Sequence, residues 1–195
     1  MGEEKYRKDV EKLFEKSPVV NYNSIERIIK NKKKSSKYAK KLIHYLLLKN
    51  KIKRLSKGYY TIMNEISLVV FAFEPSYLGL QDALSFHNLW EQETVPIIIT
   101  TRKARPGIRK VLNHNTVVRR INKKYFFGFE YKKQGDFYFP VSDIEKTFID
   151  MVYFNEHLDN EVIKEFNKRM NKKKLNSYLK KYPKKFRFKV LNYLK

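Results

Sequence analysis

The chain has no cysteine among its 195 residues, which excludes disulfide scaffolds, thiolate zinc sites and cysteine nucleophiles. Long apolar runs are also missing. The longest run, residues 68–73, has six residues, far short of the ~20 that span a bilayer. The first residues are polar and acidic, unlike a secretory signal. We therefore expect a soluble, cytoplasmic protein with no membrane-spanning segment and no membrane as its favoured partner.

Acidic side chains are scarce: 20 Asp and Glu stand against 43 Lys and Arg, a net charge of +23. The excess lies at the two ends of the chain. Residues 1–66 carry a net charge of +11, residues 67–158 +2, and residues 159–195 +10. A basic surface attracts phosphate backbones through counterion release. The charge favours nucleic acid as a partner, with an acidic protein, a membrane surface or a mere lysine bias as alternatives.

The first 50 residues predict three helices. Residues 6–14 have apolar side chains at helical spacing, and Ser17-Pro18 ends this helix. Asn23 and Glu26 have the spacing of a capping box, which predicts a short helix over 24–30. After a basic turn at 32–34, Ser35 or Ser36 is expected to cap a third helix that continues to about residue 50.

This third helix has two faces of opposite character. Four apolar residues at i, i+3, i+4 and i+7 form the expected core stripe: Ala39, Leu42, Ile43 and Leu46. A cationic face has the same spacing: Lys37, Lys40, Lys41 and His44. Such a face at a helix N-terminus suits the phosphates that line a DNA groove, although a solvated lysine face is the alternative.

A basic β-hairpin is predicted next, with residues 52–55 and 59–62 as strands and Gly58 in the turn. Three helices followed by a two-stranded wing is the element order of a winged helix-turn-helix, whose third helix enters the major groove. The predicted DNA-binding residues are those of the third helix and of the wing: Ser36, Lys37, Tyr38, Lys40, Lys41, His44, Arg54 and Lys57. Tyr38 has a second interpretation, packing on the preceding helix.

The rest of the chain predicts a mixed domain and a helical tail. Strands are expected at 68–73, 95–101 and 137–141, and a second hairpin at 116–121 and 125–130. Helices are expected at 78–87 and 142–154. Ser142 and Glu145 have the spacing of a capping box that would begin the second of these helices. Residues 159–195 are helical and rich in lysine, which indicates either a solvated face or a second nucleic-acid contact. The fold class is therefore α+β, with a winged helix-turn-helix domain (1–66), a mixed α+β domain (67–158) and a basic helical extension (159–195).

No catalytic constellation is evident. The most nuclease-like set is Asp136, Asp143, Glu145 and Lys146. Glu145 and Lys146 are adjacent, however, so a strand would direct them to opposite faces, whereas a metal-dependent nuclease needs them on one face. The four histidines lack metal-ligand spacing, and His87 is expected to be a hydrogen-bonded core residue. We expect no enzymatic activity, no metal and no cofactor.

Three segments resemble AbiEi-type antitoxins and related viral-defence transcriptional regulators: residues 52–61 (IKRLSKGYYT), 80–89 (LQDALSFHNL) and 141–150 (VSDIEKTFID). The resemblance covers residues 1 to about 155. It departs from the family at Ser142-Asp143, where a proline is usual, and in the tail.

The resemblance implies a DNA-binding regulator that represses its own operon at an inverted repeat of double-stranded DNA, which suits a dimer. It also implies a second domain that counteracts a nucleotidyltransferase-like toxin. The alternatives are a protein-binding antitoxin or scaffold that does not read DNA and, less favoured, a nuclease.

Overall fold

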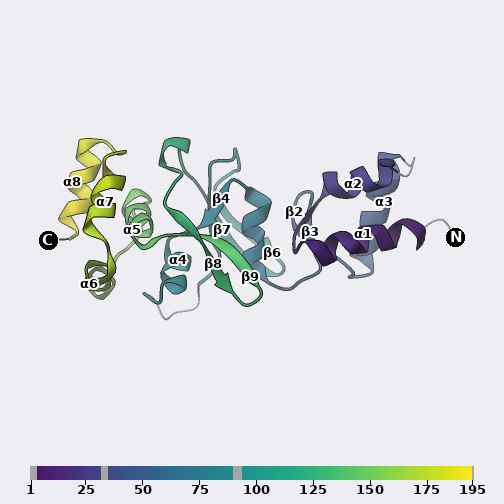
Figure 1. Ribbon diagram of the computed structural model, residues 1–195, viewed down its shortest axis with the longest axis horizontal. Helices are drawn as coiled ribbons and strands as arrows, with labels where there is room; N and C mark the ends of the chain where they lie inside the picture. The colour runs from purple at the N-terminus through teal and green to yellow at the C-terminus, as the bar shows by residue number, and fades with distance from the viewer. Residues whose placement is uncertain (1–3, 32–34, 90–93, 195) are drawn as a thin grey trace. The chain divides into compact units, whose positions relative to one another are not determined.

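The protein is a mixed α+β structure. The computed structural model describes residues 4–31, 35–89 and 94–194 (Figure 1), so the predicted basic turn at 32–34 lies outside the described residues. The chain forms two compact units. The first unit comprises Met1–Ala72 with Lys110–His114, and the second comprises Phe73–Arg109 with Asn115–Lys195.

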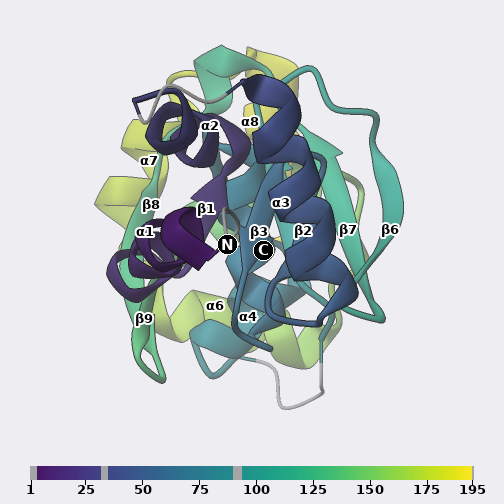
Figure 2. The ribbon, with the colours of Figure 1, turned by 90° about the vertical axis from the view of Figure 1, so that its right-hand side faces the viewer.

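The first unit contains three helices and a small antiparallel sheet (Figure 2). These helices and strands, in chain order, are α1 (Glu4–Lys16), β1 (Val20–Asn21), α2 (Tyr22–Asn31), α3 (Ser36–Leu48), β2 (Lys53–Ser56) and β3 (Tyr59–Thr61). Most of a 3-10 helix, η1 (Ile66–Phe73), also belongs to this unit. The strand order is β1-β3-β2. The three helices and the hairpin predicted from the sequence are present, and the short strand β1 was not predicted.

The core of this unit is one apolar cluster. Val10 and Phe14 of α1 and Ile25 and Ile29 of α2 are buried in it. The α3 stripe predicted to face the core is buried in the same cluster: Ala39, Leu42, Ile43 and Leu46. The helical spacing of apolar residues therefore identified the inward face of α3 correctly.

The predicted capping box of the second helix is wrong. The Asn21 side chain, and not that of Asn23, accepts a hydrogen bond from the Ser24 backbone N–H at 2.9 Å. Asn23 lies inside α2, and the Glu26 carboxylate accepts from the Tyr22 hydroxyl at 3.1 Å. The cap lies at Asn21 because β1 pairs with β3 and holds Asn21 opposite Tyr59. Helix α2 therefore begins at Tyr22, two residues before the predicted start.

The chain also forms a six-stranded mixed sheet with the order β6-β7-β5-β4-β9-β8, most of which belongs to the second unit. The strands are β4 (Ser76–Leu78), β5 (Ile97–Thr100), β6 (Gly107–Val111), β7 (His114–Arg120), β8 (Phe129–Gln134) and β9 (Phe137–Ser142). Strands β5 and β9 occur where the sequence predicted them. Helix α4 (Gln81–Phe86) is shorter than predicted, because the first residue of its expected range, Leu78, belongs to β4.

Two elements predicted after the first hairpin are wrong. Residues 68–73, expected as a strand, belong to the 3-10 helix η1 (Ile66–Phe73), since a short and wholly apolar run does not distinguish the two structures by periodicity. The expected hairpin of 116–121 with 125–130 does not form. The Asn122 side chain accepts from the Lys124 N–H and starts the 3-10 turn η2 (Lys123–Tyr125), so β7 pairs with β5 and β8 pairs with β9 instead.

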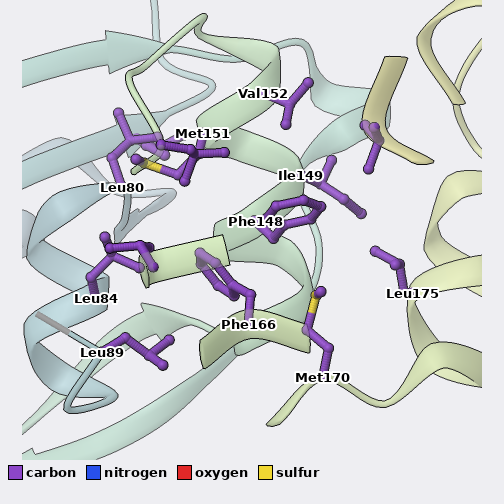
Figure 3. Packing of buried hydrophobic residues seen from close by; sticks show 14 of the residues in the cluster. Leu80, Leu84, Leu89, Phe148, Ile149, Met151, Val152, Phe166, Met170 and Leu175 are labelled. Carbon is purple, nitrogen blue, oxygen red and sulfur yellow. The ribbon is translucent and has the colours of Figure 1, made fainter. Parts of the chain in front are cut away.

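Helix α5 (Ile144–Tyr153) lies at the centre of the second unit. It contacts α4 and β9 as well as α6 (Asn160–Arg169), α7 (Lys172–Leu179) and α8 (Lys184–Asn192). Figure 3 shows Phe148 of α5 pointing toward Phe166 of α6, with 5.0 Å between the ring centroids. The three C-terminal helices therefore share the core of the second unit. The sequence had led us to expect a separate basic helical extension over residues 159–195.

The N-cap of α5 is Asp143 and not Ser142. The Asp143 carboxylate accepts from the Lys146 backbone N–H at 2.8 Å. Ser142 is the last residue of β9, and its hydroxyl lies 2.7 Å from that of Thr147. The strand extends one residue further than the sequence pattern indicated, and this moves the cap by one position.

His87 follows α4 and is buried, as predicted. Its Nε2 lies 2.7 Å from the Ser142 carbonyl oxygen, so a neutral imidazole donates this hydrogen bond. Burial lowers the pKa of His87 below its ordinary value of 6.5, and the hydrogen bond to Ser142 opposes the shift more weakly.

Because the unfolded chain binds a proton at His87 near pH 6.5 and the folded chain binds it only at lower pH, the free energy of unfolding falls as the pH drops below this value. We expect His87→Gln to show a smaller loss of melting temperature than the wild type between about pH 7.5 and 5.5. His114→Gln, at an exposed position of β7, is the control. Equal pH dependence in all three proteins would contradict the assignment.

Candidate nucleic-acid interface

Helix α3 has a cationic face that is open to solvent. Lys37, Lys40, Lys41 and His44 are all exposed, while the apolar stripe of the same helix is buried. The face continues into apolar side chains. Leu48, one turn beyond His44, is 68% exposed, and Tyr45 is 36% exposed. The helix therefore presents cations over its first turns and apolar groups toward its C-terminus.

Ser36 and Tyr38 are placed differently from the lysines. Both are half-buried. A hydrogen bond from Ser36 to the Glu26 carboxylate is the main cause that lowers the pKa of Glu26, so the Ser36 hydroxyl connects α3 to α2. Tyr38 packs against the buried cluster of the first unit. Its second interpretation, packing on the preceding helix, fits this position.

The predicted wing is an antiparallel hairpin of β2 and β3. Arg54 and Lys57 are exposed on it. Gly58 has φ +80°, a conformation that side-chain-bearing residues rarely adopt, and its carbonyl oxygen accepts from the Tyr22 N–H at 2.7 Å. The turn of the hairpin is thereby attached to the first turn of α2.

The hairpin is also attached to the end of α3. The Leu46 carbonyl oxygen accepts from the Lys51 N–H at 2.9 Å, and Ile52 is buried in the same cluster as the α3 stripe. The first unit therefore holds all eight predicted DNA-binding residues on two elements that share one core. Six of them are exposed: Lys37, Lys40, Lys41, His44, Arg54 and Lys57.

The acidic residues considered for a nuclease have structural contacts. Asp143 caps α5 and also accepts from the Tyr178 hydroxyl at 2.8 Å. Glu145 accepts from the Asn171 N–H at 2.7 Å. The Lys174 ammonium lies 3.1 Å from a carboxylate oxygen of Asp143 and 3.1 Å from one of Glu145. Asp136 is exposed in the turn between β8 and β9.

These contacts connect α7 to the N-terminus of α5. Burial and the hydrogen bond to Asp143 raise the pKa of the Tyr178 hydroxyl to about 12. Burial by itself lowers the pKa of Lys174, but the Asp143 and Glu145 carboxylates outweigh it and raise this pKa above its ordinary value. Lys174 therefore remains charged and paired at neutral pH.

Inside α5 lies a buried ion pair, Lys146 with Asp150, that was not predicted from the sequence. Both side chains are fully buried, and the Tyr77 hydroxyl donates to Asp150 at 2.7 Å. The Lys146 ammonium also lies 5.4 Å from the centroid of the Phe127 ring. Burial lowers the pKa of Lys146 and raises that of Asp150, while their mutual attraction opposes both shifts. The i, i+4 spacing of a Lys and an Asp within an apolar helix was the available signal.

The backbone at Gly128 lies close to this ion pair and to α7. Gly128 has φ +70°, and a Cβ atom there would lie 2.9 Å from the Tyr178 ring and 3.0 Å from the Lys146 Cβ. Both distances are shorter than ordinary van der Waals contact, so only glycine fits between α5 and α7 at this point.

Within the described parts of the chain, no three His, Asp or Glu side chains are grouped so that they could hold a metal ion. Among the same residues, no helix has both the length and the apolar character that crossing a bilayer requires. No protein-family model matches the chain, and no curated protein matches it either.

The buried ion pair generates a stability prediction. We expect Lys146→Met to lower the free energy of unfolding by about 3–5 kcal/mol, because it leaves the Asp150 charge buried without its partner. The double variant Lys146→Met/Asp150→Leu should recover much of this loss, because it removes both charges. Denaturant unfolding of the full chain measures both effects. A double variant that is less stable than the single one would contradict this account.

Proposed function

We propose that the chain is a sequence-specific DNA-binding transcriptional regulator, in which the first unit acts as a winged helix-turn-helix. Three helices in succession precede a two-stranded hairpin, the element order of that class of module. The observation that carries the proposal is the exposed cationic face of α3, opposite a fully buried apolar stripe.

The proposed mode of binding places α3 in the major groove. Lys37, Lys40 and Lys41 lie in the first turns of the helix, where recognition helices contact base edges and flanking phosphates. Leu48 and Tyr45, further along, provide apolar surface of the kind that contacts thymine methyl groups. Ser36 acts by positioning α3 through its hydrogen bond to Glu26.

The hairpin supplies phosphate contacts in this proposal. Arg54 and Lys57 are exposed there, and phosphate contacts fix the register of a protein on the duplex without reading sequence. Two copies on an inverted repeat near the protein's own promoter would match the two-fold symmetry of such a site. Counteraction of a nucleotidyltransferase-like toxin stays a prediction of the resemblance alone.

The test is a salt-titrated mobility shift with the chain's own upstream DNA and a scrambled duplex. We expect preference for the upstream duplex at about 0.15 M salt, and a steep fall in affinity with added salt. Replacing Lys37, Lys40 and Lys41 together by Gln should weaken binding by at least about 100-fold and remove the preference.

The matched control replaces Lys8, Lys12 and Lys16 of α1 by Gln, since these three are also exposed lysines of one helix. This variant loses the same charge and should keep its preference for the upstream duplex. Equal losses in the two triple variants, or equal affinity of the wild type for both duplexes, would show that the net charge alone drives binding and would overturn the proposal.

A further inference from the structure

The second unit has a hollow of about 310 Å³ among its three C-terminal helices. Four apolar residues line it: Met170, Leu175, Leu191 and Leu194. Figure 3 shows Met170 and Leu175 side by side at the edge of the buried cluster. We call this feature the C-terminal hollow; its volume is at the lower end of the range of about 300–1,000 Å³ that is usual for binding pockets.

An exposed apolar strip adjoins the hollow on α8. Leu191, which lines the hollow, is 37% exposed, and Phe188, one turn earlier on the helix, is 68% exposed. Residues three positions apart on a helix are neighbours on its surface. Large apolar side chains that are exposed beside a concave site are typical of a surface that binds another protein.

The rim of the hollow is polar and basic. Asn167, Asn176 and Lys172 complete its lining. Residues 172–192 hold nine Lys and Arg side chains and no Asp or Glu. Lys174 already contacts Asp143 and Glu145, and Arg187 donates to the Tyr182 and Lys180 carbonyl oxygens, whereas Lys172, Lys173, Lys184 and Lys185 are exposed.

The charge and the shape of this surface select one occupant. A second copy of the chain would bring like charges together, which costs free energy. A nucleic acid would place phosphates over an apolar floor that offers few donors. A bilayer is flat, whereas the hollow is concave. An acidic helix with an apolar stripe meets both requirements, because its apolar residues cover the hollow and its carboxylates face the lysines.

We propose that the C-terminal hollow binds an acidic amphipathic helix of a partner protein, with one large apolar side chain inserted between Met170, Leu175 and Leu191. Phe188 covers the inserted side chain from the α8 side. The exposed Lys172, Lys173, Lys184 and Lys185 pair with the carboxylates that flank the stripe. This surface is made of residues of the second unit and includes none of the residues proposed to contact DNA.

The probe is a fluorescein-labelled synthetic peptide of about 18 residues, or five helical turns. It consists of Leu, Ala and Glu, with Leu at i, i+3, i+4 and i+7. A second peptide has the same composition in a shuffled order, so its charge is equal but its leucines form no stripe. The measurement is fluorescence anisotropy with the full chain at about 0.15 M salt, a concentration that screens surface charges beyond about 8 Å. The amphipathic peptide should bind at least about tenfold more tightly than the shuffled peptide.

The variant Phe188→Gln/Leu191→Gln should lose about tenfold in affinity for the amphipathic peptide. Its matched control is Tyr131→Gln/Tyr138→Gln, which replaces two exposed side chains of the β8–β9 hairpin (65% and 59% exposed) and should bind as the wild type does. Both variants must keep the wild-type melting temperature and mobility shift. This requirement separates a failure here from a failure of the proposed regulator.

Three results would overturn the inference. The first is equal affinity for the two peptides, which would reduce the effect to net charge. The second is a dimer in sedimentation that dissociates only in the Phe188→Gln/Leu191→Gln variant, which would make a second copy the occupant. The third is binding of phosphatidylcholine and phosphatidylserine vesicles by the wild type, more tightly than the amphipathic peptide, that is lost in this variant, which would make a membrane the occupant.

Discussion

The burial of α5 is the constraint on which the second unit depends. Every residue from Glu145 to Val152 is buried, although the helix includes Glu145, Lys146 and Asp150. A buried charge is tolerated only when a partner compensates for its lost hydration. Lys146 and Asp150 compensate each other within the helix, and the Tyr77 hydroxyl adds a hydrogen bond from the sheet.

The same constraint accounts for the position of the C-terminal helices. Glu145 and Asp143 at the start of α5 take Lys174, Tyr178 and the Asn171 backbone as partners. The apolar side of α5 is covered by Phe166, Leu175 and Val190. Without α6, α7 and α8, the Asp143 and Glu145 carboxylates would lose these partners. The apolar side of α5 would then be exposed to solvent. The basic tail is therefore part of the second unit's core as well as a charged surface.

Lysine has three distinct structural roles in this chain. Lys146 is buried and paired with Asp150. Lys174 connects α7 to α5 through the carboxylates of Asp143 and Glu145. The α3 lysines are exposed to solvent. Composition gives all of them the same weight in the net charge. The proposed DNA interface uses the exposed cations of α3 and of the hairpin, and the proposed protein interface uses the exposed lysines around the C-terminal hollow. The α3 face and the hollow differ in what lies between the cations. On α3 the cations occupy the first turns as a continuous face, whereas at the hollow they surround an apolar floor.

The sequence by itself determined the three helices and the hairpin of the first unit, because their signals are short-range: the apolar stripe of α3 has helical period, and Gly58 marks a tight turn. It also indicated the exposed cations, since residues on the opposite face of a helix from its core stripe must meet solvent. Only the tertiary structure decided the caps at Asn21 and Asp143, the 3-10 form of residues 66–73 and the partners of β7 and β8. The cap at Asn21 and the strand partners depend on residues distant in the chain, such as Tyr59 opposite Asn21, and local periodicity carries no information about such pairs. The 3-10 form of 66–73 was missed because a short apolar run has no distinguishing period.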